Sequence, residues 1–270
     1  MKKFIFTVMM IFVFVAMLLY GKYEYDQKLK ATSQLAQAEI QQYQVKLEEE
    51  RKLEAEQQRQ RVEKLVRNLQ MPLKDKVIAS LENKEPLQVV AMGSRALTGV
   101  DDISPWPELF QDLVNDAYGQ KLFQVTTLAY GTSNTFDIVP NKKHMEAAQL
   151  KPDIIILEPF IWNNNGFARI EDTLYHIGVM VRDLKRENED MAIFIQPPNP
   201  IFGASFYGEQ VETVKQYCLE NNLVFHDHWQ TWPDLNDVKL KQYLLADDNI
   251  PNQEGHNLWA TSLVKTFAAN

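Results

Sequence analysis

Cysteine is almost missing from this chain, which limits what can hold the fold together. The 270 residues include one cysteine, Cys218, so no internal disulfide can form. The apolar spacing around Cys218 is typical of an amphipathic helix and predicts a small core side chain rather than a reactive thiol. Stability must therefore come from a packed core, and hydrophobic residues make up 45% of the chain.

An excess of positive charge is also missing. Lysine and arginine total 28 residues against 36 aspartates and glutamates, so the formal net charge is −8. A nucleic-acid partner would require a basic surface. The composition therefore argues against nucleic-acid binding.

A signal-peptidase motif is missing after the first apolar segment. Residues 4–20 hold one polar residue, Thr7, and lysines flank both ends. No A-x-A pattern follows, and the length reaches the lower limit of a spanning helix. We therefore predict that residues 1–22 form an uncleaved transmembrane anchor, with a cleaved signal peptide as the alternative. The N-terminal lysines favour the cytoplasm for that end, which predicts a single-pass cell-membrane protein with an extracytoplasmic C-terminal domain.

Glycine and proline are absent from residues 24–70, which consist largely of strong helix formers. An apolar stripe with 4-3-4 spacing, typical of a coiled-coil seam, crosses the first half of this segment. The stripe consists of Ala36, Ile40, Tyr43 and Leu47. Glu50 and Glu54 then interrupt it. We predict a long solvated helix, either a stalk that forms a homodimer or a charged helix without a partner, within a stalk and linker region of residues 23–86.

The remaining residues, 87–270, alternate apolar strands with amphipathic helices. The expected strands are 87–92, 122–129, 154–157, 191–196 and 223–226, and the expected helices are 105–118, 145–149, 170–188, 207–221 and 252–267. The all-apolar run 154–157 is typical of a central parallel strand. The pattern predicts an α/β fold, an open, mostly parallel sheet with helices on both faces. Ligands of such sheets bind at the carboxyl ends of the strands.

Four short motifs lie at those strand ends or at the start of the last helix. Gly93-Ser94-Arg95 follows the first strand, Gly131 the second and Asn163 the third, and residues 247–256 open the last helix. Their order and spacing resemble the SGNH/GDSL hydrolase superfamily of esterases, lipases and carbohydrate deacetylases, over residues 87–270. The resemblance implies a three-layer, flavodoxin-like fold and ester hydrolysis without a cofactor or metal.

The resemblance also implies a role for each motif. In the family, a serine attacks the ester carbonyl, and a histidine, oriented by an aspartate three residues before it, takes the serine proton. The oxyanion is held by the serine N–H, a glycine N–H and an asparagine amide. Gly131 takes the glycine position and Asn163 the asparagine position, with Asn164 and Asn165 as alternatives.

The catalytic positions of the family match this chain less directly. Against Gly-Asp-Ser-Leu-Thr-x-Gly, an ungapped alignment places Ser94 on the aspartate and Arg95 on the serine. Against Asp-x-x-His-Pro-Asn-x-x-Gly-His, Asp247 takes the aspartate position and Ile250 the catalytic histidine position. The remaining catalytic candidates are Ser94 in a shifted turn, His256 as a replacement base, and Asp247. The alternative for Ser94 is a turn or helix-cap hydroxyl.

A histidine pair lies at the end of the last expected strand. His226, Asp227 and His228 have side chains that bind metals. No further ligand is evident in the sequence, so packing at the sheet edge is expected and no metal site is assigned.

Three functions follow from these observations. The first is a membrane-tethered hydrolase that deacylates a glycan or lipid of the cell envelope. The second is a non-catalytic module of the same fold, in which Arg95 recognises an anionic group of an envelope glycan or a protein partner. The third is a scaffold that acts through its helical stalk.

Overall fold

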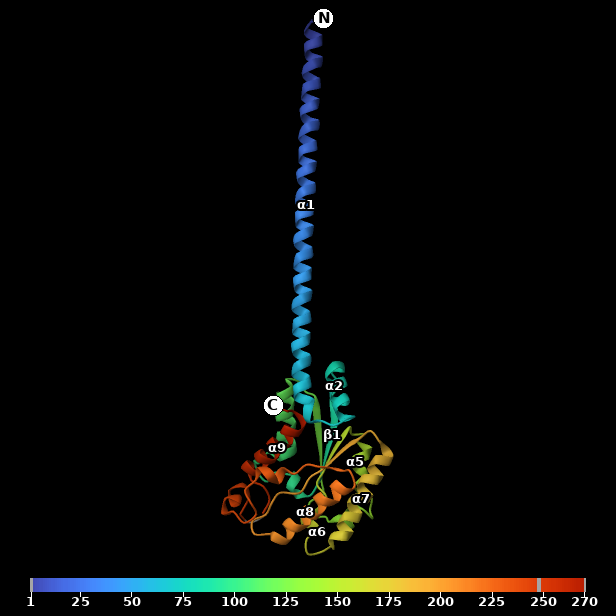
Figure 1. Ribbon diagram of the computed structural model, residues 1–270, viewed down its shortest axis with the longest axis vertical. Helices are drawn as coiled ribbons and strands as arrows, with labels where there is room; N and C mark the ends of the chain where they lie inside the picture. Colours follow the sequence, from blue (N-terminus) through green and yellow to red (C-terminus); the bar gives the residue numbers. More distant parts are fainter. Residues whose placement is uncertain (1, 247–248, 270) are drawn as a thin grey trace. The chain divides into compact units, whose positions relative to one another are not determined.

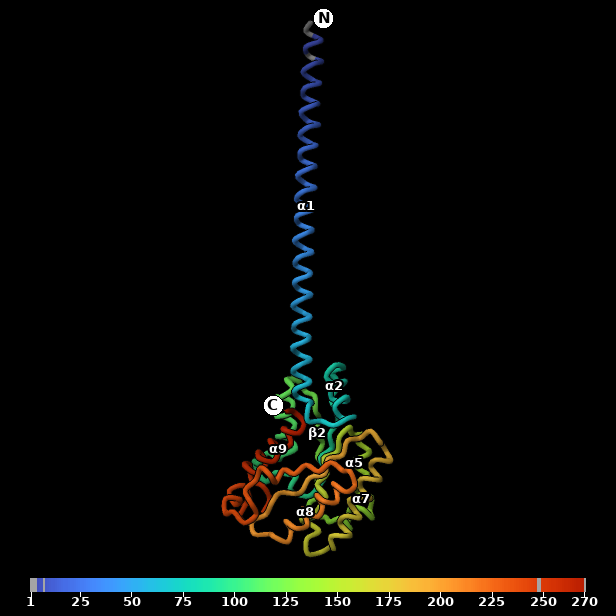
Figure 2. Tube along the Cα trace, in the orientation of Figure 1, coloured from blue at the N-terminus to red at the C-terminus, as the bar shows by residue number. Residues whose placement is uncertain are grey.

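The chain divides into two compact units, Met1–Arg61 and Val62–Asn270 (Figures 1 and 2). The computed structural model describes residues 2–246 and 249–269. The first unit consists of helix α1 (Lys2–Leu65) up to the unit boundary, and the second contains the sheet.

Helix α1 runs without a break from Lys2 to Leu65. An 18-residue window near its N-terminus has a mean hydropathy of 2.5, so by length and composition it could cross a membrane. A signal sequence would pass the same test. The seam residues Ile40, Tyr43 and Leu47 are exposed. The apolar side chains of this unit therefore do not form a core of their own.

A five-stranded parallel sheet with the order β2-β1-β3-β4-β5 forms the centre of the second unit. The strands are β1 (Leu87–Gly93), β2 (Phe123–Ala129), β3 (Ile154–Leu157), β4 (Ala192–Ile195) and β5 (Val224–Phe225). The strand order reverses at β1, which pairs with β2 on one side and β3 on the other. This topology confirms the predicted α/β sheet, and in sheets of this kind ligands bind at the carboxyl ends of the strands where the order reverses, here beside β1.

Helices cover both faces of the sheet (Figure 1). One face carries α3 (Trp106–Tyr118) and α9 (Gln253–Phe267), and the other carries α5 (Met145–Gln149), α7 (Ile170–Glu187) and α8 (Ser205–Glu220). Successive residues of a strand point to opposite faces, so Val89 packs in the first core and Val90 in the second. The buried strands must therefore be apolar on both sides, as Ile154–Leu157 is.

The start of the second unit contributes to its core. Val66, which begins η1 (Val66–Asn68), is fully buried, and so is Val77 of α2 (Leu73–Asn83). Both belong to the apolar cluster beneath α3 and α9. Within this unit, the Ala269 N–H also donates to the Leu65 carbonyl at 2.8 Å. Residues 62–86 thus pack as part of the sheet-containing unit.

Short helical segments interrupt the loops after the strands, and the sequence pattern did not predict them. They are η2 (Arg95–Leu97), α4 (Thr135–Ile138), α6 (Ile161–Asn164), η3 (His228–Thr231) and η4 (Val238–Tyr243). Each is too short for an apolar period to develop. Three of them, η2, α4 and α6, follow β1, β2 and β3 and carry or adjoin the expected site residues.

The aromatic cluster around Phe267 provides a test of the core. Its fully buried ring contacts the rings of Phe110, Phe123 and Phe194. We expect Phe267→Ala to lower the free energy of unfolding by about 3–5 kcal/mol, because it removes this contact area and leaves a cavity. Phe206→Ala is the matched control, since that ring is 63% exposed. Equal losses in urea unfolding of the two variants would contradict this account of the core.

Candidate functional site

The turn after β1 contains the expected nucleophile region. Gly93 ends the strand, and a Cβ at this position would lie 2.7 Å from the Glu158 Cβ and 2.8 Å from the Leu97 Cδ1, so glycine is required. Ser94 is the N-cap of η2, where its Oγ accepts a hydrogen bond from the Ala96 N–H at 3.2 Å. The residue is 3% exposed. Ser94 therefore serves as the capping hydroxyl of this turn.

A buried carboxyl that the sequence analysis missed holds this turn in place. Glu158 directly follows β3 and is fully buried. Its Oε2 accepts from the Ser94 N–H at 2.7 Å, and its Oε1 accepts from the Phe160 N–H at 2.8 Å. Burial raises the pKa of Glu158, although hydrogen bonds from the side chain and backbone of Ser94 and from Phe160 oppose the shift. A lone carboxyl directly after an all-apolar strand was the signal available in the sequence.

Hydrogen bonds connect the loops after β1, β2 and β3. The Arg95 N–H donates to the Gly131 carbonyl at 2.9 Å. The Asn163 side-chain amide donates to the same carbonyl at 3.1 Å and to the Ser133 carbonyl at 2.7 Å. Gly131 has a φ of +59°, in the left-handed region that glycine adopts without strain. The structure thus brings together Arg95, Gly131 and Asn163, three of the residues expected at the site.

The direction of these hydrogen bonds limits what the three residues can do. An oxyanion hole requires donors that point toward the position of the substrate oxygen. Here the Arg95 N–H and the Asn163 amide both donate to the Gly131 carbonyl. Two of the donors that the family resemblance assigns to the oxyanion are therefore engaged within the protein.

The structure also distinguishes the neighbouring asparagines. Asn164 is buried, and its side chain accepts from the Thr135 N–H at 3.0 Å and donates to the hydroxyls of Thr135 and Thr173. These bonds join α6 to α4 and α7. Asn165 follows α6, and its backbone N–H donates to the Ile161 carbonyl. Asn163 is thus the one of the three whose side chain is bonded to the Gly131 loop.

The two positions expected to supply the base have different surroundings. His256 lies in the first turn of α9 and is fully buried. Its Nδ1 accepts a hydrogen bond from the backbone N–H of Trp106 at 3.1 Å. The neutral ring therefore carries its proton on Nε2. Burial lowers the pKa of His256 to about 4. Ile250 is a buried apolar residue of the loop before α9, and Asp247 lies outside the described residues.

The histidines after β5 pack against α9. The His228 Nδ1 accepts from the Trp232 indole N–H at 3.0 Å, and its ring stacks on Trp259 at 4.2 Å. The ring nitrogens of His226 lie within hydrogen-bonding distance of the hydroxyls of Ser262 and Thr266. Within the parts of the chain that the structure describes, no group of three or more His, Cys, Asp or Glu side chains could hold a metal ion.

Glu158 makes the stability of the turn dependent on pH. Its folded-state pKa is raised above the ordinary value of 4.5, so the native state binds this proton more tightly than the unfolded chain does. Its contribution is greatest below the unfolded pKa and is lost as the pH rises toward the folded pKa. Glu158→Gln cannot ionise, and its amide cannot accept from both N–H donors. We expect it to cost about 1–3 kcal/mol near pH 4.

The cost of Glu158→Gln should then shrink as the pH rises toward about 7. Urea unfolding at several pH values measures both effects. Glu220→Gln, on the surface of α8, is the matched control and should differ little from wild type throughout. A cost of Glu158→Gln that grows with pH would contradict the raised pKa.

Comparisons with known proteins find no match by sequence and several matches by fold. No protein-family model matches the sequence, and no curated protein matches it significantly. Solved structures do match. A protein of Desulfitobacterium hafniense described as lipolytic and of the G-D-S-L family has 21% identity and a TM-score of 0.53, over 67% of this chain and 99% of its own.

Two further solved structures have the same fold. A GDSL-like lipase from Bacteroides thetaiotaomicron has 14% identity and a TM-score of 0.51, over 72% of this chain and 96% of its own. A lipase/acylhydrolase from Enterococcus faecalis has 18% identity and a TM-score of 0.51, over 66% and 94%. At these identities the similarity is one of fold. The chain therefore contains the fold of the SGNH/GDSL hydrolases, and the resemblance that the motifs indicated is confirmed at that level.

Proposed function

We propose that this chain is a membrane-anchored protein of the SGNH fold that binds a ligand of the cell envelope without hydrolysing it. The observation that carries this proposal is the bonding at the carboxyl ends of β1, β2 and β3. The groups expected to act on an ester donate to, or accept from, other groups of the protein.

Accessibility supports the absence of hydrolysis. A nucleophile must come within about 3–3.5 Å of the carbonyl carbon that it attacks. Ser94 is 3% exposed, and its hydroxyl is engaged by Ala96 and Glu158. Arg95 and Ile250 take the nucleophile and base positions of the family motifs. The Arg95 guanidinium stays protonated and the Ile250 side chain has no polar group, so neither can act as a nucleophile or accept a proton.

Arg95 is the group that we propose recognises the ligand. It is half-buried at the loop junction, where its backbone N–H bonds to Gly131. A guanidinium presents a planar set of donors that matches a carboxylate or phosphate. Acetylxylan esterases are among the solved structures of similar fold, so polysaccharide ligands are associated with it. We therefore propose an anionic group of an envelope glycan as the ligand.

The first test is for esterase activity. We expect the full chain to hydrolyse p-nitrophenyl acetate no faster than buffer, and Ser94→Ala to leave that rate unchanged. Turnover above buffer that Ser94→Ala abolishes would overturn the proposal in favour of a hydrolase acting on an acylated envelope glycan or lipid.

The second test is for binding. In fluorescence anisotropy with a labelled anionic envelope polysaccharide, we expect Arg95→Ala to weaken binding about tenfold or more, because a charge-assisted bidentate contact is lost. Arg95→Lys should recover part of the affinity. Arg186→Ala, which removes an exposed arginine from the last turn of α7, is the charge-matched control. Equal losses in Arg95→Ala and Arg186→Ala would argue against a site at Arg95.

We further propose that α1 spans the cell membrane and that the sheet-containing unit is extracytoplasmic. Cys218 is buried, and burial raises the pKa of its thiol to about 12, so the wild-type chain should resist maleimides. Lys239→Cys adds one exposed thiol. We expect a membrane-impermeant maleimide to label this variant on intact cells and to leave the wild type unlabelled. Labelling that appears only after lysis would place the domain on the cytoplasmic side.

A further inference from the structure

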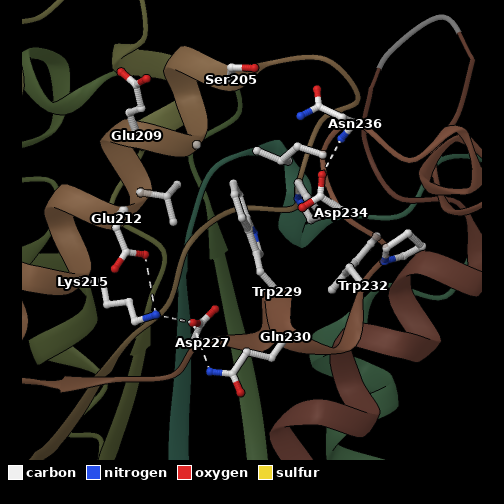
Figure 3. Close-up of a pocket in the computed structure, with 15 residues that line it drawn as sticks. Ser205, Glu209, Glu212, Lys215, Asp227, Trp229, Gln230, Trp232, Asp234 and Asn236 are labelled. Carbon is white, nitrogen blue, oxygen red and sulfur yellow. Dashed lines mark hydrogen bonds and ion pairs between the residues drawn. The ribbon is translucent and has the colours of Figure 1, made fainter.

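A pocket of about 650 Å³ lies between α8 and the segment that follows β5 (Figure 3). It is separate from the loops that carry the family motifs, because none of its lining residues belongs to them. The lining combines two indole rings, those of Trp229 and Trp232, with a majority of polar and charged side chains. This lining offers both charged groups and aromatic surface to a ligand.

Trp229 provides a fixed aromatic surface in this pocket. Its indole N–H donates to the Pro198 carbonyl at 2.7 Å, and its ring meets the Tyr207 ring edge to face at 5.4 Å. The ring stands among the lining side chains of Figure 3 and is partly exposed. Because these contacts already hold the indole in place, a ligand that stacks on it would not have to order it.

The charged groups of the pocket are mostly negative. Glu209, Glu212, Asp227 and Asp234 line it together with a single cation, Lys215. The Lys215 Nζ lies 2.8 Å from the Asp227 Oδ2 and 3.6 Å from the Glu212 Oε2, so one positive charge is shared between two carboxylates. The pocket therefore retains an excess of negative charge, which repels anions and attracts cations.

We propose that this pocket binds a lysine or arginine side chain from a basic segment of a partner protein. The cationic group would lie against the Trp229 ring, since the face of an indole attracts cations, with the carboxylates around it. Val211 and Leu235 also line the pocket and match the aliphatic part of such a side chain. The volume exceeds that of one ammonium group and leaves room for neighbouring residues of the segment. This site is independent of the one proposed at Arg95.

The test uses the full chain and a fluorescent hexalysine peptide, with binding followed by anisotropy. We expect saturable binding that weakens by about tenfold or more as the salt concentration rises from about 0.05 M to about 0.5 M, because exposed charges are screened. Trp229→Leu should weaken binding about tenfold, and Trp229→Phe, which keeps an aromatic face, should weaken it less. The second variant keeps the test decisive if the first fails to fold.

A matched pair of charge variants separates a site from general attraction to an acidic protein. Glu209→Gln removes a lining carboxylate that lies outside the Lys215 ion pairs, and Glu220→Gln removes one from the same helix outside the pocket. We expect a loss of about threefold or more in the first and little change in the second. Equal losses, or no saturable binding of hexalysine at low salt, would overturn the proposal. So would salt-independent binding of a neutral chitooligosaccharide that Trp229→Leu abolishes while hexalysine does not bind, since that result would identify a sugar site.

Discussion

The buried carboxyl of Glu158 is the constraint on which the candidate site depends. It directly follows the central strand β3, accepts backbone hydrogen bonds from Ser94 and Phe160, and so connects the turn after β1 to the loop after β3. A carboxyl can occupy such a position only when donors surround it, because an unpaired charge in the interior is costly. Gly93 is part of the same arrangement, since any side chain there would collide with Glu158. The carboxyl, the glycine and the turn are therefore a single structural unit.

In our proposal, this unit accounts for a chain that has the fold of the family without its chemistry. The parallel sheet places the loops after β1, β2 and β3 at its carboxyl-end edge, and hydrogen bonds join these loops at Gly131. What differs is the direction of the polar groups at the junction. Donors that would have to face a substrate face the Gly131 carbonyl, and the serine hydroxyl faces the interior. These bonds stabilise the junction, and in our proposal they also engage the groups that ester hydrolysis would need.

Our two proposals concern ligands of opposite charge. At the ends of β1, β2 and β3 the proposed recognition group is the cation Arg95, whereas the pocket beside α8 is lined by carboxylates and indole rings. Groups of opposite charge on separate surfaces favour partners of different chemistry, because each surface repels what the other attracts. In our proposals, one domain could thus hold a glycan and a basic protein segment at the same time.

The sequence by itself determined the strands, the longer helices and the class of fold. Strong helix formers without glycine or proline produced α1 beyond Tyr23, and short segments rich in apolar and β-branched residues produced the strands from β1 to β4. These are properties of neighbouring residues, so a pattern reveals them. The positions of Arg95, Gly131 and Asn163 at one sheet edge also followed, since parallel strands share their carboxyl ends.

Only the tertiary structure decided what each polar group at the site contacts. His256 bonds to Trp106 across 150 positions of the chain, and Glu158 bonds to Ser94 across 64. Adjacent asparagines have different partners because α6 turns Asn163 toward Gly131 and Asn164 toward α4 and α7. Hydrogen bonds depend on distance and direction between groups far apart in sequence, and no local period encodes them.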